Sequence, residues 1–154
     1  MGPGKIRELF DYDPHTGILR WRVSKARRIH TGDIAGVPSG NRLNVMIDYC
    51  NYKVHHLCWA YFYGVWPTSE LDHKDGNGLN NSIDNLREAT RSQNSGNMRA
   101  HSDNVLGFKG VSQSRNKFVA RVKGRRIGLY DTPEEAYASY CVEAKKEFGE
   151  FFRP

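Results

Sequence analysis

The 154-residue sequence predicts an α+β fold built in two parts. Several short segments alternate apolar and polar residues with a period of two, as half-buried strands do, while others repeat apolar residues at helical spacing. The stretch from residue 70 to residue 97 is rich in Asp, His and Asn, a mixture that no core strand needs. Beyond residue 104 the pattern changes to three short basic strands followed by one helix.

Composition favours a soluble globular protein with an acidic partner. Hydrophobic residues make up 38% of the chain and charged residues 26%, which is ordinary for a folded domain. The formal net charge of +6 and a pI near 9.3 favour nucleic acid as that partner. No apolar run approaches the roughly 18 residues that span a bilayer, so we expect no membrane association. Three scattered cysteines argue against a zinc-finger site and, with no signal peptide in view, predict a cytoplasmic location.

The first residues predict a short helix, a turn and a strand. Lys5–Phe10 is the expected helix, and Asp13–Gly17 has the Pro and Gly of a tight turn. Ile18–Val23 then alternates as a half-buried strand. The basic residues of this region form either a solvated edge or a phosphate-contacting arm, and the candidates for the arm are Arg20, Arg22, Arg27 and Arg28.

A hairpin and a helix are expected next. Arg42–Ile47 and Tyr52–Val54 alternate as two strands around a four-residue turn. His55–Tyr63 repeats apolar residues at helical spacing, which predicts a helix. Gly64 and Pro67 follow it as stop signals.

The polar stretch between residues 70 and 97 predicts a strand, a loop and a helix. Leu71–His73 should close the strand, and Gly76–Asn81 suits a loop because Gly and Asn tolerate left-handed backbone. A helix is expected over residues 85–94, capped by Ser82 or Asp84.

The residue types in this stretch suit phosphodiester hydrolysis. Asp72 offers a hard oxygen ligand for a divalent cation, and the adjacent His73 offers an imidazole that can take a proton from water. The amides of Asn85 and Asn94 can help to hold these groups in place. This pattern therefore predicts a metal-dependent nuclease site.

Residues 98–106 predict a polar linker, and a separate small domain is expected over residues 107–154. Strands are expected over 107–112, 117–123 and 126–130, with turns at 115–116 and 124–125. Thr132, Pro133 and Glu135 form a capping box that should start a covering helix. Basic residues of this sheet are either solvated charges or DNA contacts, and the candidates for DNA binding are Lys109, Arg115, Lys117, Arg121, Lys123 and Arg126.

The first two thirds of the chain resembles the homing-type HNH endonucleases of phages. The motifs that carry this resemblance are Asp11-Tyr12-Asp13-Pro14, Val54-His55-His56-Leu57-Cys58-Trp59, Leu71-Asp72-His73, Asn80-Asn81, Asp84-Asn85-Leu86-Arg87 and Gln93-Asn94. The resemblance implies a nuclease domain over residues 1–97, in which 5–50 supply N-terminal strands and a basic segment and 51–97 form a ββα-metal core.

The same resemblance assigns roles to four residues. It implies that Asp72 and Asn94 bind one Mg²⁺ or Mn²⁺ ion, that His73 is the general base, and that the amide of Asn85 orients the imidazole. Hydrolysis in this family leaves a 5′-phosphate and a 3′-hydroxyl.

Residues 107–154 resemble the AP2/ERF DNA-binding domain. The resemblance lies in Phe108-Lys109-Gly110-Val111, Phe118-Val119-Ala120-Arg121-Val122 and Ile127-Gly128-Leu129-Tyr130-Asp131-Thr132-Pro133-Glu134-Glu135-Ala136. In that family a three-stranded antiparallel sheet, backed by a helix, lies in the major groove of double-stranded DNA. Several aromatic and arginine residues of the plant domains are missing here, which implies looser sequence specificity.

We therefore expect an HNH DNA endonuclease that nicks or cuts double-stranded DNA inside a phage-infected host cell. One alternative is a DNA-binding protein on a silent nuclease scaffold, and another is a protein that interacts with a host nuclease. The full set of Asp72, His73, Asn85 and Asn94 favours the enzyme. Both a monomer and a homodimer are compatible with the sequence.

Overall fold

Alternating residues and one tight turn fold the N-terminus into a helix and a hairpin. The structure is a computed structural model that describes residues 1–25, 28–98, 100 and 103–154. Helix α1 (Pro3–Leu9) leads directly into β1 (Phe10–Asp13), which pairs antiparallel with β2 (Ile18–Trp21). The sequence predicted a helix and β2 but missed β1, because Phe10 leaves the helix in extended backbone and the four-residue strand is too short to show alternation.

A second sheet and a helix follow. Strands β3 (Val37–Ser39), β4 (Arg42–Ile47) and β5 (Cys50–Lys53) form an antiparallel sheet in the order β3-β4-β5. Helix α2 (Val54–Tyr63) starts where β5 ends and stops at Gly64, whose φ of 74° is the left-handed backbone expected at a helix end. The predicted helix is thus confirmed.

The helix predicted over residues 85–94 is wrong. The short 3₁₀ helix η1 (Ile83–Asn85) is followed by strand β7 (Leu86–Ala89), which pairs antiparallel with β6 (Glu70–His73). Helix α3 (Arg91–Asn97) begins only afterwards. Leu86 and Ala89 are buried, so pairing with β6 and burial decide the conformation of a segment whose caps alone favour a helix.

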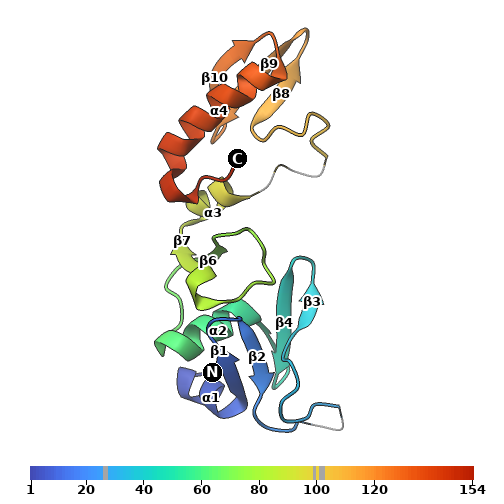
Figure 1. The fold of residues 1–154 in the computed structure, drawn as a ribbon, viewed down its shortest axis with the longest axis vertical. Helices are drawn as coiled ribbons and strands as arrows, with labels where there is room; N and C mark the ends of the chain where they lie inside the picture. The colour runs from blue at the N-terminus through green and yellow to red at the C-terminus, as the bar shows by residue number, and fades with distance from the viewer. Residues whose placement is uncertain (26–27, 99, 101–102) are drawn as a thin grey trace. The chain divides into compact units, whose positions relative to one another are not determined.

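The chain divides into two compact units, Met1–Thr90 and Arg91–Pro154 (Figure 1). In the first unit α2 is the central element, in contact with α1, β1, β4, β5 and η1. Apolar side chains around it form one buried core, which includes Ile6, Phe10, Leu19, Trp21, Val45, Ile47, Leu57 and Cys58. This core supports the end of the β6–β7 hairpin through Leu86.

The second unit contains a three-stranded sheet and a long helix. Strands β8 (Val111–Ser114), β9 (Lys117–Val122) and β10 (Arg125–Tyr130) are antiparallel, in the order β10-β9-β8. Helix α4 (Pro133–Phe148) crosses one face of this sheet and leads into the 3₁₀ helix η2 (Gly149–Phe151) (Figure 1). Its first turn is capped by Thr132, whose hydroxyl accepts a hydrogen bond from the Glu135 amide.

Two predicted details of this unit differ from the structure. The first strand was expected over residues 107–112 but begins at Val111, because Gly107 and Gly110 take left-handed backbone and form turns. The second turn uses Lys123 and Gly124, both with positive φ, one residue earlier than predicted. A domain limit at residue 97 and a linker over 98–106 stay predictions, and residues 99, 101 and 102 lie outside the described residues.

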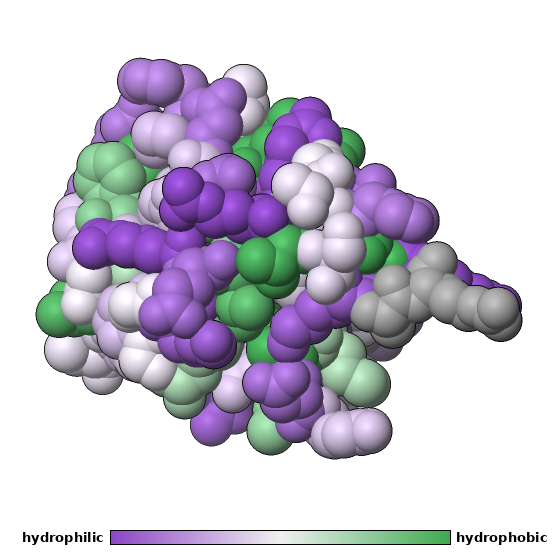
Figure 2. Space-filling view, turned by 90° about the horizontal axis from the view of Figure 1, so that it is seen from below, coloured by the Kyte–Doolittle hydropathy of each residue, from purple (hydrophilic) through white to green (hydrophobic). Residues whose placement is uncertain are grey.

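The face of the protein seen in Figure 2 is mainly hydrophilic, with apolar residues scattered among polar ones. In the part of the chain that the structure describes, no helix combines the length and apolar character that a membrane span requires.

Candidate functional site

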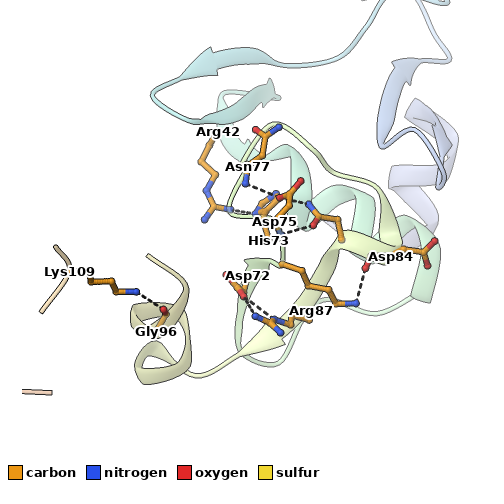
Figure 3. Close-up of polar contacts among 11 residues, drawn as sticks. Arg42, Asp72, His73, Asp75, Asn77, Asp84, Arg87, Gly96 and Lys109 are labelled. Carbon is orange, nitrogen blue, oxygen red and sulfur yellow. Dashed lines mark hydrogen bonds and ion pairs between the residues drawn. The ribbon is translucent and has the colours of Figure 1, made fainter. Parts of the chain in front are cut away.

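The ends of β6 and β7 bring a carboxylate, an imidazole and a guanidinium together. Asp72 and His73 are the last residues of β6, and the two residues are 4% and 2% exposed. Arg87 lies directly opposite Asp72 on β7, and its Nε and Nη2 donate hydrogen bonds of 2.9 and 2.8 Å to Asp72 Oδ2 (Figure 3). Two donors on one oxygen hold this buried carboxylate in a fixed orientation.

Both ring nitrogens of His73 have identifiable partners. Nη1 of Arg42 lies 2.6 Å from Nδ1, and because a guanidinium can only donate, Nδ1 is the acceptor (Figure 3). Nε2 lies 3.1 Å from Asn81 Oδ1, while the amide nitrogen of Asn81 donates to the Leu79 carbonyl. These partners assign the proton of the neutral ring to Nε2 and leave the lone pair on Nδ1.

The first hairpin holds Asn81 in place. The hydroxyl of Tyr12 on β1 donates a 2.7 Å hydrogen bond to the Asn81 carbonyl, and both residues are buried. Desolvation by burial raises the pKa of Tyr12, so the phenol stays a donor. Gly17, with a φ of 74°, packs so closely against the backbone of Asn81 and Ser82 that a side chain there would collide with them.

His55 of α2 lies against the ring of His73, and His56 lies against the ring of His55. The centroid of the His55 ring lies 5.1 Å from that of the His73 ring and 4.6 Å from that of the His56 ring, and both pairs have edge-to-face geometry. His55 is 3% exposed, and burial lowers its pKa to about 2. Burial is also the main cause that lowers the pKa of His73. The hydrogen bond to Asn81 has the next-largest effect and raises this pKa, the charge of Arg42 lowers it, and the charges of Asp75 and Asp72 raise it. His73 is therefore a neutral base at physiological pH.

Asp75 is the centre of the loop between β6 and β7. Its carboxylate accepts hydrogen bonds from the Asn77 amide and from the side-chain amides of Asn80 and Asn85. Burial opposes ionisation of Asp75, but these hydrogen bonds outweigh it and lower the pKa. Asn85 is buried, also accepts from the Asp75 amide and donates to the Asn80 carbonyl, so its side chain closes the loop.

The four residues predicted for catalysis fall into two groups. Asp72, His73 and Asn85 lie together in the β6–β7 hairpin and its loop. The amide that lies against a ring nitrogen of His73 is that of Asn81, and orientation of His73 by Asn85 stays a prediction. Asn94 lies on α3, in the second unit, and its role as a metal ligand also stays a prediction.

The donor chemistry fits a hard divalent cation held by few protein ligands. Asp72 supplies a buried carboxylate, and Asn94, the other predicted ligand, would supply an amide oxygen. Among the described residues, no group of three or more His, Cys, Asp and Glu side chains could hold a metal ion. Mg²⁺ and Mn²⁺ suit such a sparse oxygen set because they keep several water ligands and bind phosphate oxygens.

The predicted basic arm lies partly on β2. Arg20 is exposed and donates to the Gly32 carbonyl, while Arg22 donates to the Arg7 carbonyl and lies 3.6 Å from Asp11. Arg28 is exposed, and Arg27 lies outside the described residues. A role of this arm in DNA binding stays a prediction.

Three predicted cations share the face of the second sheet that is turned away from α4. Arg121 and Arg126 are direct cross-strand partners, and Arg121 alternates with the buried Ala120 and Val122. Lys117 lies four residues before Arg121 on β9, opposite Ser114, and forms a 2.8 Å ion pair with Asp131. Arg115, in the turn between β8 and β9, is also exposed.

The other two predicted cations of this unit point elsewhere. Lys109 is partly buried, and its ammonium donates to the carbonyls of Gly96 and Arg153 (Figure 3). Lys123 pairs with Glu147 of α4 and lies over the Phe148 ring, on the helix side of the sheet. Lys123 is nevertheless exposed, and a role of Lys109 and Lys123 in DNA binding stays a prediction.

Sequence reasoning did not assign site roles to Arg42, Asn81 or Tyr12. The sequence predicts Asn81 only as a residue of the 76–81 loop, and no local pattern links it to His73. Arg42 and Tyr12 reach the site from β4 and β1, tens of residues away in the chain. The motif around Tyr12 supported the resemblance, but only the fold reveals what its hydroxyl contacts.

Comparison with known proteins relates the middle of the chain to nucleases. The family model described as HNH endonuclease matches residues 52–96, a segment that holds Asp72, His73, Asn81, Asn85 and Asn94. Arg42 and Tyr12 lie outside this match. Over this segment the chain is therefore similar to the HNH endonuclease family.

Two viral proteins are similar to part of the chain. Protein 3.8 of Escherichia phage T7 is 47% identical over 68 residues, which cover 44% of this chain and 56% of that protein. An uncharacterized HNH endonuclease of Acanthamoeba polyphaga mimivirus is 38% identical over 86 residues, which cover 54% of this chain and 46% of that protein. The chain thus spans about half the length of each of these curated relatives. No solved structure was found to match it.

Proposed function

We propose that the protein is a metal-dependent endonuclease that hydrolyses phosphodiester bonds of double-stranded DNA. The observation that carries this proposal is the neutral imidazole of His73, held at the end of a strand beside the buried Asp72 with Nδ1 as an acceptor. The match of residues 52–96 to the HNH endonuclease family supports the same class of reaction.

In this proposal His73 is the general base. Its Nδ1 accepts a proton from the water that attacks phosphorus, because the other nitrogen already carries the ring proton. The resulting imidazolium keeps its hydrogen bond from Nε2 to Asn81, and the buried Asp72 and the exposed Asp75 lie near enough to favour that charge. Asn81 is therefore a positioning residue, which acts through His73.

Asp72 and Asn94 would hold the divalent ion, Mg²⁺ or Mn²⁺. When bound, such an ion supplies Lewis-acid stabilisation of the negative charge that develops on the phosphate. Arg87 keeps the Asp72 carboxylate oriented through its two hydrogen bonds. Asn85 and Asp75 order the loop that follows His73.

The exposed cations of both units would contact the DNA backbone. On β2 and after it these are Arg20, Arg22 and Arg28, and on the second sheet they are Arg115, Lys117, Arg121 and Arg126. Phosphate contacts of this kind position a protein on a duplex without reading its sequence. An AP2-like docking of the second sheet in the major groove is part of this proposal.

The test is cleavage of supercoiled plasmid in Mg²⁺ or Mn²⁺, with EDTA and His73→Ala as controls. We expect relaxed circles that disappear in EDTA and with His73→Ala. The matched control is His15→Ala, because His15 is exposed in the first hairpin and should be dispensable. Direct linearisation would indicate two coordinated sites, as in a homodimer.

The alternative is a DNA-binding or nuclease-interacting protein on an HNH scaffold. Absence of cleavage with either metal, while a labelled duplex is still bound, would contradict the enzyme and favour that alternative. Cleavage that persists in His73→Ala would contradict the role of His73 as general base. The activity would then come from another group or from a contaminant.

A further inference from the structure

Arg42 is a charged residue of the candidate site that has no counterion among the described residues. It lies at the start of β4, is partly buried, and donates from Nη1 to Nδ1 of His73. Within the described part of the chain, Arg42 forms no ion pair with a carboxylate. Asp72, the acid whose charge acts on Arg42, is hydrogen-bonded to Arg87.

The backbone around Arg42 is shaped to bring its side chain to His73. Gly78, in the loop after β6, is buried against the turn between β3 and β4. A Cβ on Gly78 would collide with the Asn41 carbonyl and would lie 2.9 Å from Cδ and 3.1 Å from Nε of Arg42. The absence of a side chain at Gly78 thus makes room for the stem of Arg42, so the contact with His73 is built by two separate segments.

The chemistry of this arrangement points to an anionic ligand. A guanidinium carries five N–H donors in a planar fork that matches two oxygens of a phosphate, and an imidazole nitrogen uses only one of them. A partly buried charge without a counterion costs free energy, which a bound anion can recover. An anion held by Arg42 would lie next to the nitrogen that acts as base in the proposed reaction.

We propose that Arg42 binds the phosphodiester group that is hydrolysed, and that in the absence of DNA it caps Nδ1 of His73. This proposal rests on the proposed function. The Nδ1 lone pair accepts one hydrogen bond in the ring plane, so the guanidinium and the attacking water cannot both occupy it. When a phosphate engages Arg42, the cap is removed and Nδ1 becomes available to water. DNA binding and activation of the base are then one event.

The cap is tested by NMR without any cleavage. Protein labelled with ¹⁵N in histidine is compared with Arg42→Ala in EDTA, before and after saturation with a short DNA duplex. We expect Arg42→Ala to shift the Nδ1 resonance of His73 while Nε2 keeps its proton. We expect the duplex to shift the wild-type Nδ1 resonance in the same direction. If the Nδ1 resonance of His73 did not shift in Arg42→Ala, or did not shift when the duplex was added, the proposal would be overturned.

The phosphate contact is tested by kinetics of plasmid nicking. We expect Arg42→Ala to lower kcat by a factor on the order of 10², as loss of a group that stabilises transition-state charge does, while the Kd for duplex changes little. Arg42→Lys should recover part of the rate because it restores the charge without the fork. Lys53→Ala removes an exposed cation from the neighbouring strand β5 and serves as the matched control.

An unchanged or higher kcat in Arg42→Ala would contradict phosphate binding by Arg42. Intact folding of each variant is checked by tryptophan fluorescence, since Trp21, Trp59 and Trp66 all lie in Met1–Thr90. If the wild type cleaves no DNA, the proposed function fails, and the NMR comparison still decides whether Arg42 leaves His73 for a phosphate.

Discussion

The ring of His73 is held by a donor from β4 and by an acceptor from the loop that follows β6. Arg42 fixes Nδ1 as an acceptor, and Asn81 accepts the proton of Nε2. This division matters because a base must present a lone pair at one defined atom. In the proposed reaction, proton transfer at His73 therefore depends on the partners of both ring nitrogens.

Replacement of Asn81 tests this dependence. Asn81→Ala removes the acceptor of Nε2–H but keeps the backbone carbonyl that binds Tyr12. Loss of a hydrogen bond worth about 1 kcal/mol in the transition state should lower kcat of nicking about fivefold, with the Kd for duplex unchanged. Asn51→Ala, an exposed amide on β5, is the control. Equal rates for the two variants would show that Asn81 does not position His73.

The buried His55 makes the first unit sensitive to acid. Its pKa is about 2 in the folded protein and 6.5 in an unfolded chain, so folding is favoured while the ring is neutral. Stability is fully present above pH 6.5 and decreases as the pH falls through that value toward 2. Between pH 6.5 and 4.5 we expect a loss of about 2–3 kcal/mol.

Urea unfolding followed by tryptophan fluorescence measures this loss. The tryptophans report on Met1–Thr90, where His55 lies. His55→Phe keeps a ring in the core but cannot take up a proton, so its stability should fall less between pH 6.5 and 4.5 than that of the wild type. His15→Phe, at an exposed position, should behave as the wild type does. If the free energy of unfolding fell by the same amount between pH 6.5 and 4.5 in the wild type and in His55→Phe, protonation of His55 would not be the cause of the loss.

At the scale of elements, the loop of the candidate site is held by the hairpin that precedes it. The Ile83 amide donates to the Pro14 carbonyl, Tyr12 donates to Asn81, and Gly17 packs on the backbone of Asn81 and Ser82. The β1–β2 hairpin thus supports the loop that carries Asn81, the partner of His73.

Gly17 and Gly40 form a matched pair that isolates this close packing. Both have positive φ, 74° and 61°, so alanine strains the backbone at either site. A Cβ at Gly17 would meet the Asn81–Ser82 backbone, whereas nothing lies within 4 Å of one at Gly40. We expect Gly17→Ala to lose at least about 2 kcal/mol more stability than Gly40→Ala in urea unfolding, and to lose nicking activity as well. Equal losses of stability in Gly17→Ala and Gly40→Ala would mean that the close packing of Gly17 on Asn81 and Ser82 does not contribute to stability.

Elements with a strong local pattern were predictable from the sequence. The alternation in Arg42–Ile47 and the stop at Gly64 placed β4 and α2, and the capping box at Thr132 placed α4. β7 was missed because its four residues take strand conformation only by pairing with β6. In the same way Asp72 and His73 were recognisable as an adjacent pair, but Arg42 and Asn81 were not, since their contacts with His73 arise from tertiary structure.

At the scale of the whole molecule, the positive charge is unevenly divided. Residues 91–154 contain 12 Lys and Arg against 7 Asp and Glu, which gives +5 of the formal net charge of +6. The first unit is thus nearly neutral, although it holds the proposed chemistry. This division suits a protein in which the second unit provides most of the affinity for DNA and the first unit provides the reaction.

The salt dependence of DNA binding tests that division of roles. Each phosphate contact that is lost lowers the slope of log K against log salt concentration by about 0.9. Arg121 and Arg126 face away from α4, so the double variant Arg121→Gln/Arg126→Gln should reduce the slope by about 2. The control Lys145→Gln/Lys146→Gln removes the same charge from exposed positions of α4 and should change the slope little. The measurement is anisotropy of a labelled duplex in EDTA, where no strand is cut. Equal effects of the two double variants would mean that net charge, and not this face of the sheet, attracts the DNA.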